Sequence, residues 1–196
     1  MNFRTIGARA PRRILACLLL LETLALGAAA HGLEASPPAY GWLEWAALEP
    51  QHVMLKAKLD SGARTSSLSA VEVERFTREG EDWVRFVVPI SAFDGATGEA
   101  QRIAMERPLQ REALIKRHGA SASVRPVVQV DICLGGHVFT TPVTLTDRSR
   151  FNYPLLLGRS ALRGRAMIDV EQTYIHGIER DSCAPSAARP ANSGKE

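Results

Sequence analysis

Hydrophobic and polar residues alternate along much of the chain, with the period of a β-strand that buries one face. The alternation is clearest over residues 53–60 and 84–88, and a longer run covers 124–134. A second long run follows at 138–146, and the apolar triplet 155–157 has the length and composition of a buried strand. The pattern therefore predicts a chain built mainly of short strands.

Turn and helix signals between these runs indicate how the strands connect. The glycine pair 135–136 separates two strand-like runs and predicts a hairpin, and Pro142 places the returning strand at an edge or a bulge. Residues 160–165 are expected to form one or two helical turns, followed by closing strands at 166–170 and 173–175. Many short strands with almost no helix predict an all-β fold, a small closed barrel with one short helix.

Residues 1–30 differ from the rest of the chain and have the pattern of a signal peptide. A basic stretch ends at Arg13, an apolar run covers 14–21, and small residues lead to an expected cleavage site after Ala30. Glu22 interrupts an apolar run already shorter than the ~20 residues that a membrane span requires, which disfavours a retained anchor. The sequence predicts export to the periplasm or the exterior, with no stable membrane span after processing.

The net charge of the chain is carried by this leader. It holds four of the 24 basic residues and one of the 21 acidic residues, so 20 of each remain after processing. A mature chain that is neutral overall has no general attraction for polyanions, and no nucleic-acid partner is expected.

The remaining chain is expected to form one folded domain. Residues 31–39 are predicted to be a short linker, 40–178 the domain, and 179–196 a flexible polar tail. A hydrophobic content of 45% excludes a disordered chain. Cys133 and Cys183 either form a disulfide or remain two thiols, and the alternation predicts that Cys133 points away from the core.

The segment with the clearest chemical meaning is Asp60-Ser61-Gly62, which directly follows an alternating strand. Asp60 would place a carboxylate at the strand end, the Ser61 hydroxyl could hold the loop, and Gly62 would allow close approach of backbone or substrate. Asp-Ser-Gly alone is a common turn sequence. About a hundred residues later, the segment 153–159 supplies an apolar run that ends in Gly158-Arg159.

Together these two segments resemble the retropepsin type of aspartic peptidase, in which an apolar-apolar-Gly segment packs beneath an Asp-Thr/Ser-Gly-Ala loop. The span 41–175 is similar to a retropepsin-like family whose members often carry the label ATP-dependent zinc protease. The matching segments are 41–45, 57–68, 83–86, 125–128, 144–148 and 155–159. The resemblance implies a retropepsin-like barrel, aspartic peptidase activity on peptides or proteins, and a catalytic role for Asp60, Ser61 and Gly62.

Neither zinc nor ATP is expected as a cofactor, despite that label. A zincin helix needs His-Glu-x-x-His, and the five histidines stand far apart in the sequence. Residues 158–165 lack the lysine and the glycine spacing of a phosphate-binding loop. The motifs therefore support no metal and no nucleotide.

An aspartic peptidase needs two carboxylates that share a proton, and the chain has one Asp-Ser-Gly. A twofold homodimer that joins two copies of Asp60 is the simplest solution, and a monomeric site that borrows another group is the alternative. We interpret Asp94 as part of a loop or flap tip and Asp147 as part of a turn or ion pair. A catalytically silent module that binds peptides or envelope components is the competing functional hypothesis.

Basic residues gather between 102 and 125, and others lie beside the two motif segments. We predict Arg64, Lys116 and Arg159 as substrate-binding residues, in a basic rim that favours acidic peptides. The resemblance adds weight, because some family members are associated with glutamate-tail chemistry. A solvated basic surface remains the alternative. The three tryptophans, Trp42, Trp45 and Trp83, are interpreted as core or interface packing.

Overall fold

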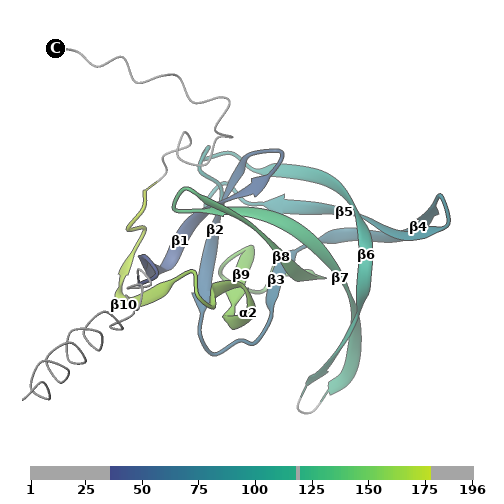
Figure 1. Cartoon of the computed structure of the whole chain (residues 1–196). Helices are drawn as coiled ribbons and strands as arrows, with labels where there is room; N and C mark the ends of the chain where they lie inside the picture. Colours follow the sequence, from purple (N-terminus) through teal and green to yellow (C-terminus); the bar gives the residue numbers. More distant parts are fainter. Residues whose placement is uncertain (1–35, 118–119, 178–196) are drawn as a thin grey trace, which may run out of the picture. The chain divides into compact units, whose positions relative to one another are not determined.

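Ten strands and one short helix form the described part of the chain, residues 36–117 and 120–177, in the computed structural model (Figure 1). The strands are β1 (Ala39–Glu49), β2 (Val53–Asp60), β3 (Ser66–Ser69), β4 (Val71–Arg78), β5 (Glu81–Ile90), β6 (Gln101–Arg117), β7 (Ala120–Leu134), β8 (His137–Thr146), β9 (Leu155–Gly158) and β10 (Met167–Thr173), and the helix is α2 (Arg159–Leu162).

The sheet closes on itself because β1 pairs with strands on both sides. It pairs antiparallel with β2, and its C-terminal part, from Ala46 to Glu49, also pairs antiparallel with β7. The ring β1–β2–β9–β3–β8–β7 is therefore a closed six-stranded barrel. This architecture confirms the predicted all-β fold, a small closed barrel with one short helix.

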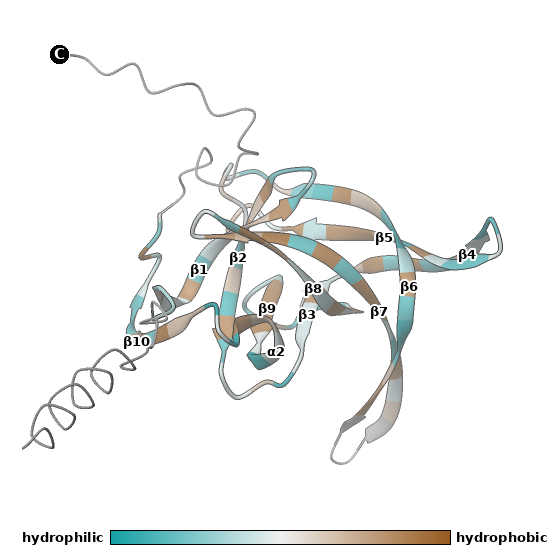
Figure 2. Cartoon of the chain, viewed as in Figure 1, coloured by the Kyte–Doolittle hydropathy of each residue, from teal (hydrophilic) through white to brown (hydrophobic). Residues whose placement is uncertain are grey.

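The alternation of the sequence decides which side chains fill the barrel. Leu55, Ala57 and Leu59 of β2 are buried in one core cluster with Leu155 and Leu157 of β9. Figure 2 shows the same alternation of hydrophobic and hydrophilic residues along the longer strands. Each buried leucine contributes about 1.5–3 kcal/mol to stability, so the apolar face of each strand is held inward. The opposite face of β2 is left to Lys56, Lys58 and Asp60.

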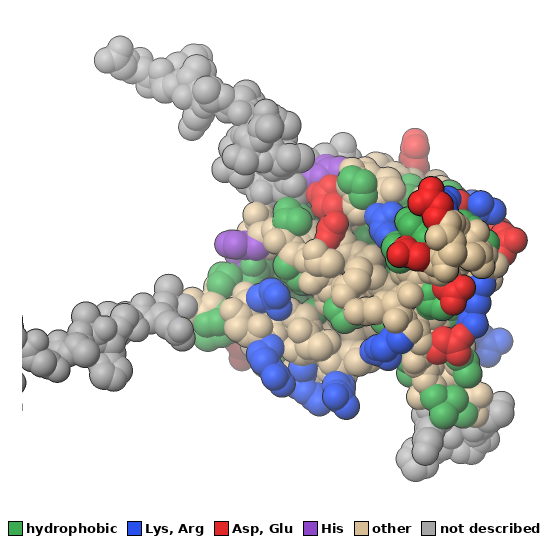
Figure 3. Space-filling model, turned by 45° about the vertical axis from the view of Figure 1, so that its right-hand side comes forward, with side chains coloured by type: hydrophobic (Ala, Val, Ile, Leu, Met, Phe, Trp, Pro, Cys, Tyr) green, Lys and Arg blue, Asp and Glu red, His purple; other side chains and the backbone are tan. Residues whose placement is uncertain are grey.

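Three strands form a second layer that we call the outer sheet, made of β4, β5 and residues 101–108 of β6. One face of its middle strand, with Val84, Phe86 and Val88, is buried in the barrel core. Beyond residue 108, β6 pairs with β7 in a long hairpin (Figure 1). On the face shown in Figure 3, Asp and Glu side chains lie beside Lys and Arg at the upper right, and Lys and Arg gather at the lower left.

The C-terminal part of the domain differs from the prediction of two closing strands. A single strand, β10, pairs in parallel with β1 outside the barrel ring. It ends before Tyr174, which has a φ of 55° and turns the chain. Buried Glu44 then fixes the following segment, because its Oε1 accepts hydrogen bonds from the amides of Gly41 (2.7 Å) and Ile175 (3.0 Å). Hydrogen bonding to the buried Glu44 carboxylate on β1, and not strand pairing, thus fixes the segment where a second strand was predicted.

Pro142 lies in a strand with neighbours on both sides, between β7 and β3. The pairing of β8 with β3 begins only at Val143, so Pro142 itself has β7 alone as a neighbour. The predicted edge is therefore local to this residue and not a property of the whole strand.

Cys133 points away from the main core, as the alternation predicts, but it is not exposed. It is fully buried in a second, small cluster with Ala47 and Met54, against which Trp45 and Ala96 pack. Cys133 is disulfide-bonded to a partner that lies outside the described residues. The predicted partner, Cys183, is among the residues that are not described.

Several expectations fall on residues outside the described ranges. These are the signal peptide 1–30, most of the linker 31–39 and the tail 179–196. In the ranges 36–117 and 120–177, no helix is long and apolar enough to cross a membrane.

Candidate catalytic site

Asp60 is the last residue of β2 and lies beside the strand that the sequence predicted to pack against it. The parallel register of β2 and β9 pairs Ala57 with Leu155 and Asp60 with Gly158. The predicted packing of the Asp60 segment against residues 156–158 is therefore observed. Since Leu59 points into the core, the Asp60 side chain points to the other face of the strand.

The loop after Asp60 lies directly against the end of β9. A Cβ atom at Gly158 would stand 2.6 Å from the carbonyl oxygen of Thr65, so only glycine fits without moving the loop. The backbone amide of Arg159 donates to the carbonyl of Ala63 at 2.9 Å. The junction of β9 and α2 thus sets the position of the Asp-Ser-Gly loop.

Both oxygens of the Asp60 carboxylate have donors. Oδ1 accepts hydrogen bonds from the amides of Gly62 (2.9 Å) and Ala63 (3.2 Å), and Oδ2 lies 3.2 Å from Nζ of Lys58. Partial burial alone would raise the pKa of Asp60, but the hydrogen bonds and the charge of Lys58 outweigh it and lower the pKa. With 22% of its side chain exposed, Asp60 is an ionised carboxylate that a substrate can reach.

This carboxylate lines a cavity of about 430 Å³, which we call the Asp60 cavity. Its other lining residues are Trp42, Lys58, Arg148, Arg150, Phe151, Asn152, Tyr153 and Leu156. The ring centroids of Trp42 and Tyr153 lie 6.1 Å apart in an edge-to-face arrangement. The two rings form one wall of the cavity. Trp42, interpreted from the sequence as core or interface packing, therefore lines the Asp60 cavity.

Arg148 is the most buried charged group of this cavity. Its Nε donates to the carbonyl of Tyr153 (2.9 Å) and its Nη1 to Oγ of Ser67 (2.7 Å), and its guanidinium lies 4.7 Å from the ring of Phe151. Burial lowers the pKa of Arg148 below that of an ordinary arginine, the charge of Arg125 lowers it further, and Asp60 acts in the opposite direction.

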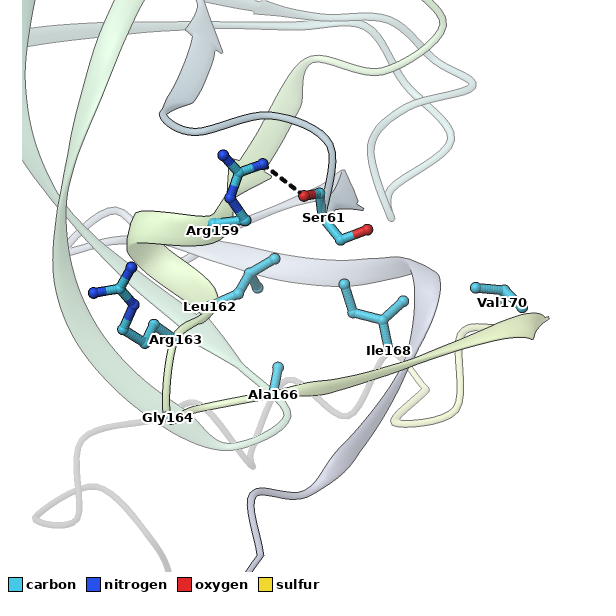
Figure 4. A pocket seen from close by; sticks show the side chains of 8 residues that line it. All are labelled: Ser61, Arg159, Leu162, Arg163, Gly164, Ala166, Ile168 and Val170. Atoms are coloured by element: carbon cyan, nitrogen blue, oxygen red, sulfur yellow. Dashed lines mark hydrogen bonds between the residues drawn. The ribbon is translucent and has the colours of Figure 1, made fainter.

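Ser61, the next residue along the chain, lines a different cavity, of about 480 Å³ (Figure 4). Apolar side chains from α2 and β10 line much of it, among them Leu162 and Ile168. Nη1 of Arg159 donates to the carbonyls of Ser61 and Gly62, both at 2.8 Å. The Ser61 hydroxyl points away from Arg159 in Figure 4 and makes no hydrogen bond to the described residues. Backbone groups, the Asp60 carboxylate and Arg159 therefore hold the loop, whereas the sequence predicts this role for the Ser61 hydroxyl.

Two of the three predicted substrate-binding residues, Arg64 and Arg159, lie at the Asp-Ser-Gly loop but do not line the Asp60 cavity. Arg159 is engaged with the Asp-Ser-Gly loop, and Arg64 is exposed on that loop and lines neither cavity. The side chain of Lys116 lies outside the described part of the structure. In the 102–125 segment, Arg102 pairs with Glu72 and Arg107 donates to the carbonyl of Glu49.

The cations that do lie beside Asp60 are Lys58, Arg148 and Arg150. Lys58 was detectable from the sequence, because residues two apart on a strand share a face. Arg148 and Arg150 follow β8, and no local pattern indicates that the loop after this strand returns to the end of β2.

Asp94 and Asp147, the other carboxylates considered from the sequence, lie in a loop and a turn. Asp94 lies in the loop between β5 and β6, and its carbonyl accepts a hydrogen bond from the amide of Lys56 in β2 (2.9 Å). Asp147 accepts a hydrogen bond from the amide of Ser149 (2.8 Å), which is the predicted turn. In the part of the chain that the structure describes, no three His, Cys, Asp or Glu side chains converge as metal ligands.

A closed barrel with an Asp-Ser-Gly loop braced by an apolar strand that ends in glycine defines a retropepsin-like domain. Residues 39–179 match the RimB-like family, described as the retropepsin-like aspartic endopeptidase RimB, and the chain belongs to this family. The match confirms the resemblance found in the sequence.

Curated relatives and one solved structure extend this comparison. The chain is 35% identical over 142 residues to a "Probable alpha-L-glutamate ligase" of Shewanella halifaxensis, which covers 70% of this chain and 30% of that protein. A protein of the same name from Desulfotalea psychrophila is 35% identical over 115 residues, 59% of this chain and 24% of that protein. The chain thus spans less than a third of the length of these relatives. A crystal structure of a Legionella pneumophila protein of unknown function has 35% identity and a TM-score of 0.59, covering 70% of this chain and 97% of that one.

Proposed function

We propose that the protein is an exported aspartic peptidase in which the Asp60 carboxylate activates a water molecule for attack on a peptide bond. The observation that carries this proposal is the geometry of Asp60, whose carboxylate accepts hydrogen bonds from its own loop and lines a cavity, in a chain of the retropepsin-like family. An ionised carboxylate can accept the proton of the attacking water.

A second carboxylate must polarise the scissile carbonyl, and we propose that a second copy of the chain supplies it. Two copies of Asp60 across a twofold axis can share one proton, as the mechanism requires. The partial exposure of Asp60 is compatible with such a contact. In the alternative, a monomeric site polarises the carbonyl with another group.

We further propose acidic peptides as the substrates. Three cations line the cavity of Asp60, and a cationic cavity favours substrates that carry carboxylates. The name of the curated relatives, glutamate ligase, refers to an acidic amino acid, which supports this choice of substrate class.

One observation favours a second candidate, a catalytically silent module that binds peptides. Lys58 already pairs with Asp60, and a carboxylate held in an ion pair is a weaker base than a free one. Substrate binding or dimerisation would have to weaken this pair before catalysis.

The decisive experiment compares the full-length protein with its Asp60→Asn variant on a library of acidic and neutral peptides. Asparagine keeps the size of the side chain but cannot take up the proton, so cleavage should fall by about 10²–10⁴-fold. Asp131→Asn is the matched control, because Asp131 is on β7 and bonds to Thr140. Equal cleavage by Asp60→Asn and wild type contradicts the catalytic role. Binding without cleavage in the wild type favours the silent module.

A mixing experiment tests the shared site. Excess Asp60→Asn protein added to the wild type should suppress its activity after subunit exchange, since mixed dimers carry one competent carboxylate. Additive activities, together with a monomeric mass in solution, contradict the dimer.

A further inference from the structure

Arg148 is a buried cation that forms no ion pair with a carboxylate of the described residues, although the charge of nearby Asp60 acts on it. Only 7% of the residue is exposed. Charged side chains are almost never buried to this degree unless they are paired. Among the described residues, no carboxylate forms an ion pair with Arg148, whose partners are the carbonyl of Tyr153 and the hydroxyl of Ser67.

One end of its guanidinium remains available for a ligand. Nε and Nη1 donate to the protein, whereas Nη2 makes no hydrogen bond to the described residues. Nη2 is also absent from the buried polar atoms that lack a partner, so it is not sealed from solvent. Arg148 is also one of the residues that line the Asp60 cavity.

The surroundings increase the positive charge at this point. Arg150 lines the Asp60 cavity and also a neighbouring cavity of about 470 Å³, which Arg125 and Asp147 line as well. The positive charge of Arg125 acts on Arg148. Asp60 acts on Arg148 and Asp147 on Arg150 through their charges, but the hydrogen bonds of Asp60 go to backbone amides and its ion pair to Lys58, and Asp147 accepts from the amide of Ser149.

We infer that the Asp60 cavity holds a carboxylate-binding subsite, in which Nη2 of Arg148 and the guanidinium of Arg150 bind a carboxylate of the peptide substrate. A guanidinium binds a carboxylate through parallel hydrogen bonds, and the Phe151 ring lies 4.7 Å from the guanidinium of Arg148. The ligand's identity rests on the proposed peptidase function, but the binding itself needs no cleavage. The subsite would select substrates with an acid close to the bond that Asp60 attacks.

The test measures binding by calorimetry in the full-length Asp60→Asn protein, which separates binding from cleavage. The probes are acetylated tri-glutamate amide, acetylated tri-glutamine amide, and acetylated tri-glutamine with a free C-terminal carboxylate. We expect one or both carboxylate probes to bind about tenfold more tightly than the neutral one. The probe that binds more tightly than the neutral one shows whether the subsite binds a side-chain or a terminal carboxylate.

Two variants test the assignment. Arg150→Gln should remove most of the preference, whereas Arg102→Gln, the same change at an arginine paired with Glu72 on the outer sheet, should retain it. Arg148→Lys keeps the positive charge but loses the parallel donors of the guanidinium, so it should weaken the preference for carboxylate probes. If this buried variant does not fold, Arg150→Gln alone decides. Equal affinity for all probes, or a preference that survives Arg150→Gln, overturns the subsite. Loss of cleavage in the wild type with the preference intact would contradict the peptidase and leave the subsite standing.

Discussion

Arginines on the outer sheet and arginines beside Asp60 show two different uses of the same side chain. The outer-sheet residues Arg75, Arg78, Arg85 and Arg102 each pair with a glutamate, and their side chains are 42–58% exposed. Arg148 is buried and has no such partner in the described residues. Exposed ion pairs contribute little to stability, so the outer-sheet arginines form a solvated surface. A buried cation that forms no ion pair in the described residues is the observation behind the proposed carboxylate subsite.

The residues that pack behind the two groups of arginines also differ, because they are apolar in the outer sheet and mostly serines near Asp60. The outer sheet covers the core with Val84, Phe86 and Val88, which are apolar. Behind Arg148 lies β3, whose four residues are all buried although three are serines. Ser66 accepts a hydrogen bond from the amide of Gly158 and Ser67 one from Arg148. Hydrogen bonds thus set positions near Asp60, where apolar packing alone would allow several arrangements.

The largest effect is expected from Gly158→Ala, because its new Cβ meets the backbone of Thr65. We expect a loss of about 3 kcal/mol in the free energy of unfolding and loss of peptide cleavage, as the Asp60 loop is displaced. Chemical denaturation and a peptide assay measure both. Gly80→Ala is the control in the turn of the outer sheet, where φ is +83° and no atom lies within 4 Å of the new Cβ. It should cost about 1 kcal/mol and leave cleavage unchanged.

Ser67→Ala tests the buried support of Arg148. Nη1 of Arg148 would lose its acceptor, and we expect a loss of about 1–3 kcal/mol in the free energy of unfolding. Thr140→Ala, which removes a hydrogen bond to Asp131 on an exposed face, is the comparison and should cost less. Equal losses in the free energy of unfolding would show that the buried hydrogen bond to Ser67 contributes no more than the exposed one to Asp131.

Lys58→Met should change the pH dependence of the site. Lys58 lowers the pKa of Asp60, so its removal raises this pKa and moves the acid limb of the cleavage rate to higher pH. A pH–rate profile of kcat/KM measures the shift. An unchanged acid limb would mean that a group other than Asp60 controls it.

The lowered pKa of Asp60 also predicts how the stability of the protein depends on pH. Because the pKa of Asp60 is lower in the folded than in the unfolded protein, its contribution is complete above the ordinary value of about 3.9. It is lost as the pH falls through the lower folded-state pKa. Wild type should therefore lose stability relative to Lys58→Met on acidification below pH ~4, as thermal unfolding at several pH values can show.

The smallest effect is expected from Glu106→Gln on the outer sheet. Glu106 pairs with Arg78 and Arg85 on an exposed face, so its loss should lower Tm only slightly. Added salt should abolish the difference between variant and wild type, because it screens exposed pairs. Peptide cleavage should not change. A large effect on cleavage would remove the distinction between the two groups of arginines.

Local patterns predicted the features that depend on neighbouring residues. The alternation over 53–60 places Leu59 inward and Asp60 outward, and the glycine pair 135–136 forms the predicted turn between β7 and β8. The apolar run ending in Gly158 indicates a buried strand, and the family resemblance places it beside Asp60. Strands with irregular patterns were not anticipated, notably β3, where serines are buried, and β1, where Glu44 is fully buried.

By itself, the sequence determined the strand-rich fold class, the direction of the Asp60 side chain and the family, because each follows from residues close together in the chain or from ordered motifs. Only the tertiary structure decided which cations from distant parts of the chain reach Asp60. Arg148 and Arg150 are about ninety residues away in sequence, and they arrive because β8, β3 and β9 are neighbours in the closed barrel. Barrel closure pairs strands that are distant in the chain, and no local pattern records which loops it joins.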